Sequence, residues 1–419
     1  MGDPRSAAFA TSVGRTTDYS AASETAVPSR TLRLLSSSSG RNRRARLSAL
    51  ENILVVDLSR VLAGPLVAMT LGDLGADVIK VESPHGDDTR HWVPPIDAQG
   101  RSSYHHAANR NKRSIVLDLK REPELELART LCERADVVIS NFKPGTLERF
   151  GLDYEVISAL NDQVVYCEIS GFGEGGGRDM LGYDPIVQAV GGLMSITGPP
   201  DAASKTGVAI VDIVTALYST IAVLAALYAR RATGRGQRVT VDLLSANLAM
   251  LANQSTGWLA DGSVPGRLGN VHPSIEPFAT YRARDGELML GAGNDGQFRR
   301  LVEAIGAPEL ADDPRFSSNE ARVFNRDALR PLLEEHLGTR SRVEWRETLL
   351  RAGVPAGPVQ TIDEAFSLAE RLGLDVVDDT DGVRTVRFPA LLSGTPAVTR
   401  RRPPDLDEHG DEIRSEFGR

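Results

Sequence analysis

Two aspartates occupy positions from which a carboxylate could act as a nucleophile. Asp212 lies in GVAIVDIVTALY, at the expected start of a long buried helix, and Asp184 lies in GYDPIVQA, after a glycine-rich segment. A helix N-terminus favours an ionised carboxylate, which is the form that attacks an electrophile. Capping a helix is the commoner role of aspartate at such a position. The local sequence does not rank the two residues.

Two groups of polar and basic side chains could contact an anionic ligand. The first, in NRNKRSIVLDLK, comprises Arg110, Lys112 and Arg113. The second, in NFKPGTLERFGLDY, comprises Asn141, Lys143 and Arg149. Arginine holds phosphate oxygens bidentately, and lysine holds them as a point charge. A solvated charged surface accounts for the first group equally well, and a turn before a helix accounts for the second.

Other catalytic and binding motifs are missing from the sequence. The first turn, LSRVLAGPLVA, lacks GxGxxG, and GxxxxGK[ST], HExxH and GxSxG do not occur. The seven histidines have no metal-ligand spacing, so no metal site is expected. A formal net charge of −8 argues against nucleic-acid binding. The longest apolar run, Ile213 to Tyr228, is short for a membrane span, so no membrane segment is expected.

The elements that must position these residues include an alternation of strands and helices that runs from about 52 to 171. The apolar runs ILVVDL, ADVIKVE, SIVLDLK, ADVVIS and QVVYCEIS have strand length, and helical segments such as PELELARTLCERA separate some of them. This pattern predicts an α/β fold with a parallel sheet covered on both faces. Ligands bind such sheets at the carboxyl ends of the strands, where GFGEGGGRDMLGYD follows.

The second half of the chain changes in texture. A helix is expected from Asp212 to about Arg231, and another over VDLLSANLAMLANQSTGWLA. After Gly262, Pro and Gly punctuate short β runs such as ELMLGAG, which predicts a smaller α+β domain.

The first fifty residues differ from the rest in composition. They are rich in Ser, Thr and Arg, poor in acids and free of Lys, which suits a mitochondrial transit peptide. A disordered bacterial extension and a start codon placed too early are the alternatives. Because Arg replaces Lys almost throughout, the chain resembles products of GC-rich bacterial genomes. We expect a cytoplasmic protein, with the mitochondrial matrix as the alternative.

Segments in the same order resemble the class III CoA-transferases, the CaiB/BaiF-type family of formyl-CoA transferase, carnitine CoA-transferase and 2-methylacyl-CoA racemase. The resemblance runs from about Leu50 to the tail. It rests on segments such as VVDLSRVLAGPLVAMTLGDLGADVIKVE, ADVVISNFKPGTLERFGLDY, GYDPIVQA and GVAIVDIVTALYSTIAVLAAL. From GLMSITG through GRLGNVHPSIEPF the chain is most similar to the succinyl-CoA:glutarate (dicarboxylate) transferases.

The resemblance implies a fold and an assembly. We expect a Rossmann-like large domain built from both termini, a smaller α+β domain, and an interlocked homodimer. The expected segments are an N-terminal extension (1–49), the large domain (50–245), a linker helix (246–265), the small domain (266–345) and a return to the large domain (346–419).

The resemblance also implies a mechanism and a site. Asp212 would attack an acyl-CoA thioester, and a mixed anhydride and an aspartyl-CoA thioester would follow before a carboxylic acid takes over the CoA. CoA and acyl-CoA are thus expected as substrates, with no permanently bound cofactor. The family's CoA contacts fall on Ala63, Leu117, Asn141 and Arg149, and we add Arg113 and Asp184 as CoA-binding candidates.

Departures from the family concern the CoA phosphates. Ser83 and Leu181 stand where formyl-CoA transferase has basic residues that help to hold them. Phosphate binding would then fall to Arg110, Arg113 or Arg149.

Two alternatives stay open at this point. The racemase branch has histidine where this chain has Tyr183, and tyrosine, with a pKa near ~10, is a poorer proton shuttle at neutral pH than histidine. This favours the transferase over the racemase. A CoA-binding paralogue without activity is the second alternative.

Overall fold

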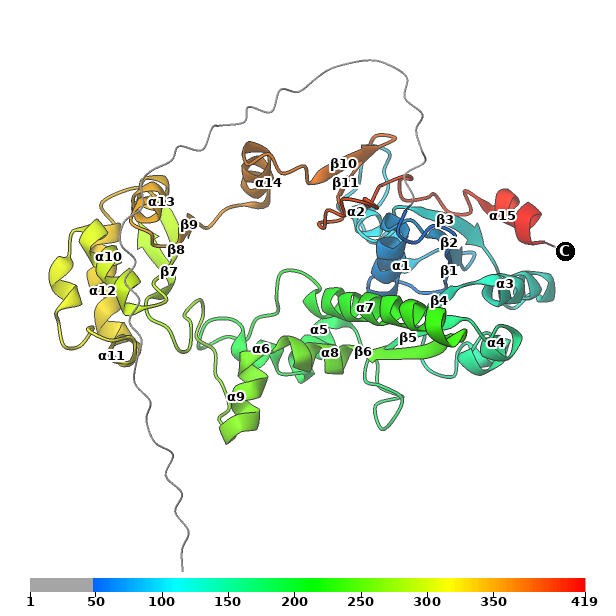
Figure 1. Ribbon diagram of the computed structural model, residues 1–419, viewed down its shortest axis with the longest axis horizontal. Coiled ribbons are helices and arrows are strands. Elements are labelled where there is room, and N and C mark those ends of the chain that lie inside the picture. Colours follow the sequence, from blue (N-terminus) through cyan, green and yellow to red (C-terminus); the bar gives the residue numbers. More distant parts are fainter. Residues whose placement is uncertain (1–47, 419) are drawn as a thin grey trace, which may run out of the picture. The chain divides into compact units, whose positions relative to one another are not determined.

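A computed structural model describes residues 48–418 (Figure 1). The predictions for the N-terminal extension therefore lie almost wholly outside the described residues. The prediction of an α/β fold with a parallel sheet is confirmed.

Six strands form one parallel sheet in this part of the chain, in the order β3-β2-β1-β4-β5-β6. They are β1 (Leu54–Asp57), β2 (Asp77–Glu82), β3 (Lys112–Val116), β4 (Val137–Ser140), β5 (Val165–Ser170) and β6 (Gln237–Asp242). The central strands are rich in valine and isoleucine because both faces of the sheet are buried. The strand order reverses between β1 and β4, and at such a point the carboxyl ends of the strands form a crevice.

Helices cover both faces of the sheet (Figure 1). One face carries α1 (Ala63–Asp73), α7 (Ile210–Thr233) and α8 (Leu243–Met250), and the other carries α3 (Glu122–Arg134), α4 (Tyr154–Leu160) and α15 (Gly410–Phe417). Successive residues of a strand serve opposite cores: Val55 packs in the α1–α7 core, and Val56 packs in the α3–α15 core. The C-terminal helix α15 thus completes the helical layer that contains α3 and α4. The large domain is therefore built from both ends of the described chain.

The C-terminal segment is joined to β3 by hydrogen bonds. The backbone N–H of Asn111 donates to the carbonyl of Arg401 at 3.0 Å, and the N–H of His409 donates to that of Ser114 at 3.0 Å. Short elements fill the remaining connections: η1 (Asp88–His91), α2 (Ser103–His106), η2 (Glu148–Phe150), α5 (Asp184–Val190), α6 (Leu193–Ile196) and α9 (Asn253–Asp261).

A second core lies in the small domain. Its antiparallel sheet contains β7 (Phe278–Ala283), β8 (Gly286–Gly291) and β9 (Ala356–Pro358). Its helices are α10 (Asp295–Ile305), η3 (Pro308–Ala311), α11 (Asn319–Phe324), α12 (Arg326–Leu337) and α13 (Arg342–Arg351). Because Leu349, Val354 and β9 belong to this core, the small domain continues to Pro358, beyond the boundary expected at 345. The return path then carries α14 (Ile362–Arg371) and the hairpin β10 (Val377–Thr380) and β11 (Val383–Val386).

Two helix predictions need correction. The segment 241–260 is not one helix, because β6 ends at Asp242 and the chain breaks between α8 and α9 at Ala252, whose φ of 47° is left-handed. Helix α7, with 24 residues, is longer than the apolar run suggested, and among the described residues it alone is long and apolar enough to cross a membrane. It packs against α1, α8, β5 and β6, and buried core helices meet the same criteria.

Candidate active site

The crevice between β1 and β4 holds a hollow of about 180 Å³, which we call the switch-point hollow. Its walls are the loops that follow β1, β4 and β5, and Asp212 of α7 also lines it. The glycine-rich loop after β5 folds back on itself, with Gly182 so close to Gly171 that a Cβ on Gly171 would lie 2.7 Å from the Cα of Gly182. Glycine is therefore required where this wall turns.

The loop after β1 is held from two sides. Asn141, at the end of β4, accepts a hydrogen bond from the N–H of Arg60 at 2.8 Å and donates its side-chain amide to the carbonyl of Arg60 at 2.7 Å. Val61 has a φ of 69°, which is unusual for a β-branched residue, and its N–H donates to the carboxylate of Asp87. These hydrogen bonds hold the loop in a conformation with a positive φ at Val61, which a β-branched residue rarely adopts.

Two buried lysines hold the same loop through hydrogen bonds to its backbone carbonyl groups. Lys80 donates to the carbonyl of Ser59 at 3.0 Å, and Lys112 donates to that of Pro65 at 2.9 Å. Lys112 also forms a buried ion pair with Asp57 at 2.8 Å. Lys112, predicted as a possible phosphate contact, is therefore part of the core under the site, and burial lowers its pKa to about 8. Sequence reasoning missed this role because a lysine before a strand is normally solvated.

Asp184, and not Asp212, caps helix α7. The helix begins at Ile210, so Asp212 is its third residue. The Asp184 carboxylate accepts hydrogen bonds from the N–H groups of Val211 at 2.8 Å and Asp212 at 3.3 Å. Asp184 is buried, and its other oxygen accepts a hydrogen bond from Gln188. The helix expected to start at Asp212 thus starts two residues earlier, and the capping role weighed for Asp212 belongs to Asp184.

The Asp212 carboxylate has no recorded hydrogen bond or ion pair among residues 48–418. Burial raises its pKa to about 7, and the negative charge of Asp184 adds to the rise. The helix N-terminus was expected to hold Asp212 ionised, and burial and the charge of Asp184 act against that. The N–H groups of the first turn are already bonded to a charged carboxylate, so their effect on Asp212 is offset.

The other predicted CoA-binding residues fall in different places. Ala63 and Asn141 line the switch-point hollow. Leu117 is buried in the α3–α15 core, Arg149 lies exposed in η2 outside the hollow, and Asp184 sits behind Asp212.

Two of the three arginines expected to bind phosphate, Arg110 and Arg113, are engaged elsewhere. Arg113 is buried and pairs with Asp77, Glu412 and Glu416, and these four residues lie together away from the hollow. Arg110 is buried and bidentate to Asp73. Both side chains are thus occupied by carboxylates that join the C-terminal segment and α1 to the sheet.

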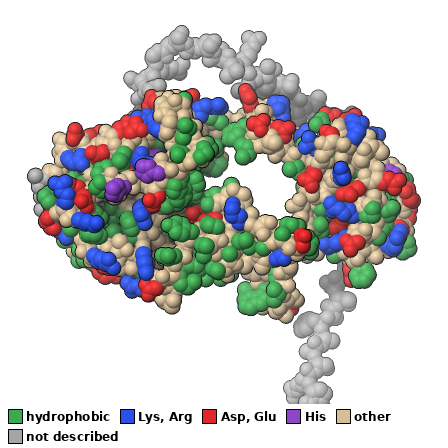
Figure 2. All heavy atoms as spheres, turned by 180° about the vertical axis from the view of Figure 1, so that it is seen from behind, with side chains coloured by type: hydrophobic (Ala, Val, Ile, Leu, Met, Phe, Trp, Pro, Cys, Tyr) green, Lys and Arg blue, Asp and Glu red, His purple; other side chains and the backbone are tan. Residues whose placement is uncertain are grey.

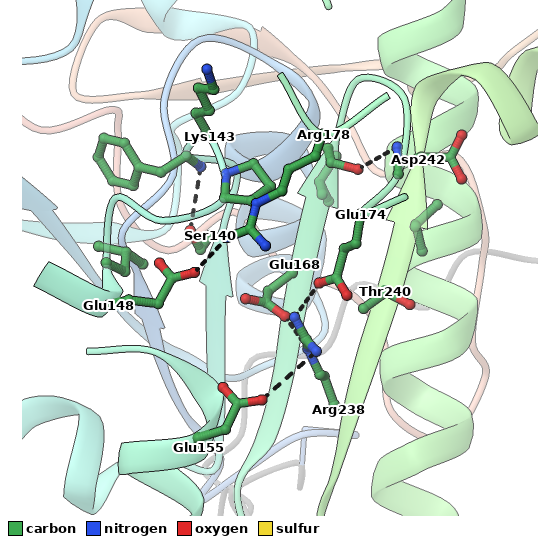
Figure 3. Close-up of a pocket in the computed structure, with 17 residues that line it drawn as sticks. Ser140, Lys143, Glu148, Glu155, Glu168, Glu174, Arg178, Arg238, Thr240 and Asp242 are labelled. Carbon is green, nitrogen blue, oxygen red and sulfur yellow. Dashed lines mark hydrogen bonds and ion pairs between the residues drawn. The ribbon is translucent and has the colours of Figure 1, made fainter. Parts of the chain in front are cut away.

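A larger hollow of about 410 Å³ is drawn in Figure 3. It adjoins the first hollow, and Phe142, Lys143 and Arg178 line both. We call it the acidic hollow. Arg238 of β6 lies in it among three glutamates, Glu155, Glu168 and Glu174. No group of three or more His, Cys, Asp or Glu residues suited to a metal ion is found in the described part of the chain.

Comparisons with known proteins agree with one another. The family model described as CoA-transferase family III matches residues 50–410. The chain is 44% identical to a succinate–glutarate CoA-transferase of Agrobacterium fabrum, over 89% of this chain and 96% of that one. It is 39% identical to an acetyl-CoA:oxalate CoA-transferase of Acetobacter aceti, over 88% and 95% respectively. A crystal structure of a CAIB/BAIF family protein from Brucella suis superimposes with a TM-score of 0.82 at 47% identity, covering 88% of this chain and 99% of that one.

Proposed function

Because the chain belongs to CoA-transferase family III and is an enzyme of that type, we propose that it moves CoA between dicarboxylic acids with Asp212 as the nucleophile. The observation that carries the proposal is the position of Asp212. Its unpaired carboxylate lines a hollow at the carboxyl ends of the strands, where α/β folds bind ligands.

The reaction consists of four successive nucleophilic acyl substitutions. A carboxylate oxygen of Asp212 attacks the donor thioester, the C–S bond breaks, and CoA leaves as the thiolate. The thiolate attacks the aspartyl carbonyl of the mixed anhydride, which releases the first acid and leaves an aspartyl-CoA thioester. The acceptor carboxylate then attacks that thioester and frees the thiolate again. Attack of the thiolate on the new acyl carbonyl gives the product and restores Asp212.

One thioester replaces another, so the protein must position the reactants and stabilise the oxyanions that develop. Helix α1 suits the second task. It begins at Ala63 on the wall of the hollow, and no side chain of the described residues caps it. Its first N–H groups have no partner within the helix and are directed toward the N-terminal end.

Succinyl-CoA as donor and a dicarboxylate such as glutarate as acceptor are the first pair to test. This choice is supported by the names of the relatives in Agrobacterium fabrum and of those in mouse and human, which are 37% and 36% identical and named succinyl-CoA:glutarate CoA-transferases. We expect labelled glutarate to appear in glutaryl-CoA when the protein is mixed with succinyl-CoA. Incorporation of solvent deuterium at the α-carbon of a 2-methylacyl-CoA, without CoA exchange, would contradict the proposal in favour of racemisation.

We further propose that the chain forms a homodimer. Large apolar side chains are exposed on α5, α8 and α9, and hydrophobic atoms gather over these elements in Figure 2. They are Ile186, Val190, Leu248, Trp258 and Leu259. Helix α7 adds Leu217, Ile221 and Tyr228, all exposed and at helical spacing. An apolar surface of this extent is typical of an interface with another protein chain.

Light scattering on the purified protein should give twice the chain mass of 45.1 kDa. The change Leu259→Glu places a charge on an apolar residue that is 73% exposed, and it should raise the monomer fraction. Phe324→Glu is the control, because Phe324 is 89% exposed on α11 of the small domain. A monomer at micromolar concentration in the unchanged protein would contradict the proposal.

A further inference from the structure

The switch-point hollow is lined by three cations: Lys143, which the sequence offered as a possible anion contact, and Arg60 and Arg178, which it did not single out. We propose that Arg60, Lys143 and Arg178 bind the phosphates of CoA in this enzyme, in place of the basic residues missing at Ser83 and Leu181. The proposal rests on the CoA-transferase function and names the residues that hold its anionic substrate.

All three cations are available to an anion. Their side chains are half-exposed, and each faces a carboxylate at the surface: Arg60 faces Asp88 at 3.4 Å, Lys143 faces Asp179 at 3.0 Å, and Arg178 faces Glu148 at 3.8 Å. Exposed pairs of this kind contribute little to stability, so exchanging the carboxylate for a phosphate costs little. Arg110, by contrast, is buried with Asp73, and withdrawing it would leave unpaired charge in the core. Arg113 is itself buried, and it is held by three carboxylates that are about half-exposed.

Arg60 is held in place before any ligand binds. Its guanidinium lies 5.1 Å from the centre of the Phe142 ring, and its backbone is bonded on both sides to Asn141. A planar guanidinium fixed in this way can present two donors to a phosphate, and little side-chain entropy remains to be lost.

Charge separates the two adjoining hollows. Lys143 and Arg178 line both hollows, and Arg60 lines only the switch-point hollow, where Asp212 is the one carboxylate among the lining residues. The acidic hollow has more room, but five carboxylates face three cations there, and Arg238 is already surrounded by glutamates (Figure 3). An anion as highly charged as CoA is therefore favoured in the first hollow and repelled by the second.

Truncated substrates test the assignment. S-succinylpantetheine has the reacting thioester and the pantetheine arm but lacks the nucleotide phosphates. Changing any one cation to Gln should lower kcat/KM for succinyl-CoA by roughly tenfold and leave that for S-succinylpantetheine unchanged. Calorimetry with CoA and with pantetheine gives a second readout that requires no turnover. Arg178→Lys and Arg60→Lys should retain part of the affinity for CoA, because they keep the charge.

Arg231→Gln is the matched control. It removes the same charge from an exposed position of α7, nineteen residues and so about 28 Å along the helix from Asp212. Equal losses with both thioesters would overturn the proposal, because the cations would then act on the acyl group or on folding. Unchanged values with both would overturn it as well. Wild-type protein that binds CoA through these residues without exchanging it would contradict the proposed function alone.

Discussion

The change Asp212→Ala is expected to abolish CoA exchange, with a fall in kcat on the order of 10⁴-fold or more. No second carboxylate can replace the nucleophile, because Asp184 is buried and bonded to the N–H groups of Val211 and Asp212. Hydroxylamine added to wild-type enzyme and succinyl-CoA should form a hydroxamate at Asp212, located by mass spectrometry of the peptide. Retention of full exchange by Asp212→Ala would show that the nucleophile lies elsewhere.

The change Asp212→Asn separates loss of chemistry from loss of folding. The pKa of Asp212 is about 7 in the folded protein, above its usual value near ~3.9, so the folded state favours the protonated carboxyl. The contribution of this group to stability is therefore full below pH 4 and is lost as the pH rises to about 7. Asn cannot ionise, so the variant should melt at or above the wild-type temperature at pH 8 while being inactive. A marked fall in its melting temperature would assign the inactivity to unfolding.

The sheet could be predicted from the sequence because its signal is local. The central strands β1 and β4 read LVVD and VVIS, so each is a short run of Leu, Val or Ile before a polar residue, and that pattern follows from burial on both faces. The break between α8 and α9 was not predictable, since a left-handed Ala252 leaves no mark in composition. The small-domain boundary was missed for a related reason: β9 is three residues long and is defined by its pairing with β8.

The grouping of the candidate site residues could be predicted only in part, and the misplaced residues share a physical cause. Asp212, Ala63 and Asn141 do line one hollow. Basic residues were harder to place, because a run of charged residues before a strand has the same sequence pattern whether its side chains are solvated or buried. Only the fold shows that Arg113 meets Glu412 and Glu416, about 300 positions later in the chain. Arg60 and Arg178 could not be identified as anion-binding candidates, because each is a single basic residue in a loop and belongs to no basic cluster in the sequence.

Exchange activity should depend on pH through the ionisation of Asp212. Only the carboxylate attacks the thioester, so kcat/KM should rise with pH to a plateau above the pKa of about 7. At pH 5, two units lower, about 1% of the group is ionised and the rate should be about 100-fold below the plateau. Steady-state rates between pH 4.5 and 9 measure this. A pH profile whose acid limb has its midpoint near pH 4 would mean that the pKa of Asp212 is not raised in the free enzyme.

Asp184 is expected to account for part of that shift. Of the groups near Asp212, Asp184 on α5 and Tyr104 on α2 interact with it electrostatically, and the cations Arg60, Lys143 and Arg178 line the same hollow. Asp184→Asn removes the negative charge but keeps an oxygen that can accept from the Val211 N–H. Its acid limb should therefore move to lower pH. Asp313→Asn, a change at a partly exposed carboxylate of the small domain, should leave the limb in place. If Asp184→Asn loses activity at every pH with an unmoved midpoint, Asp184 acts through the conformation of α7 and not through its charge.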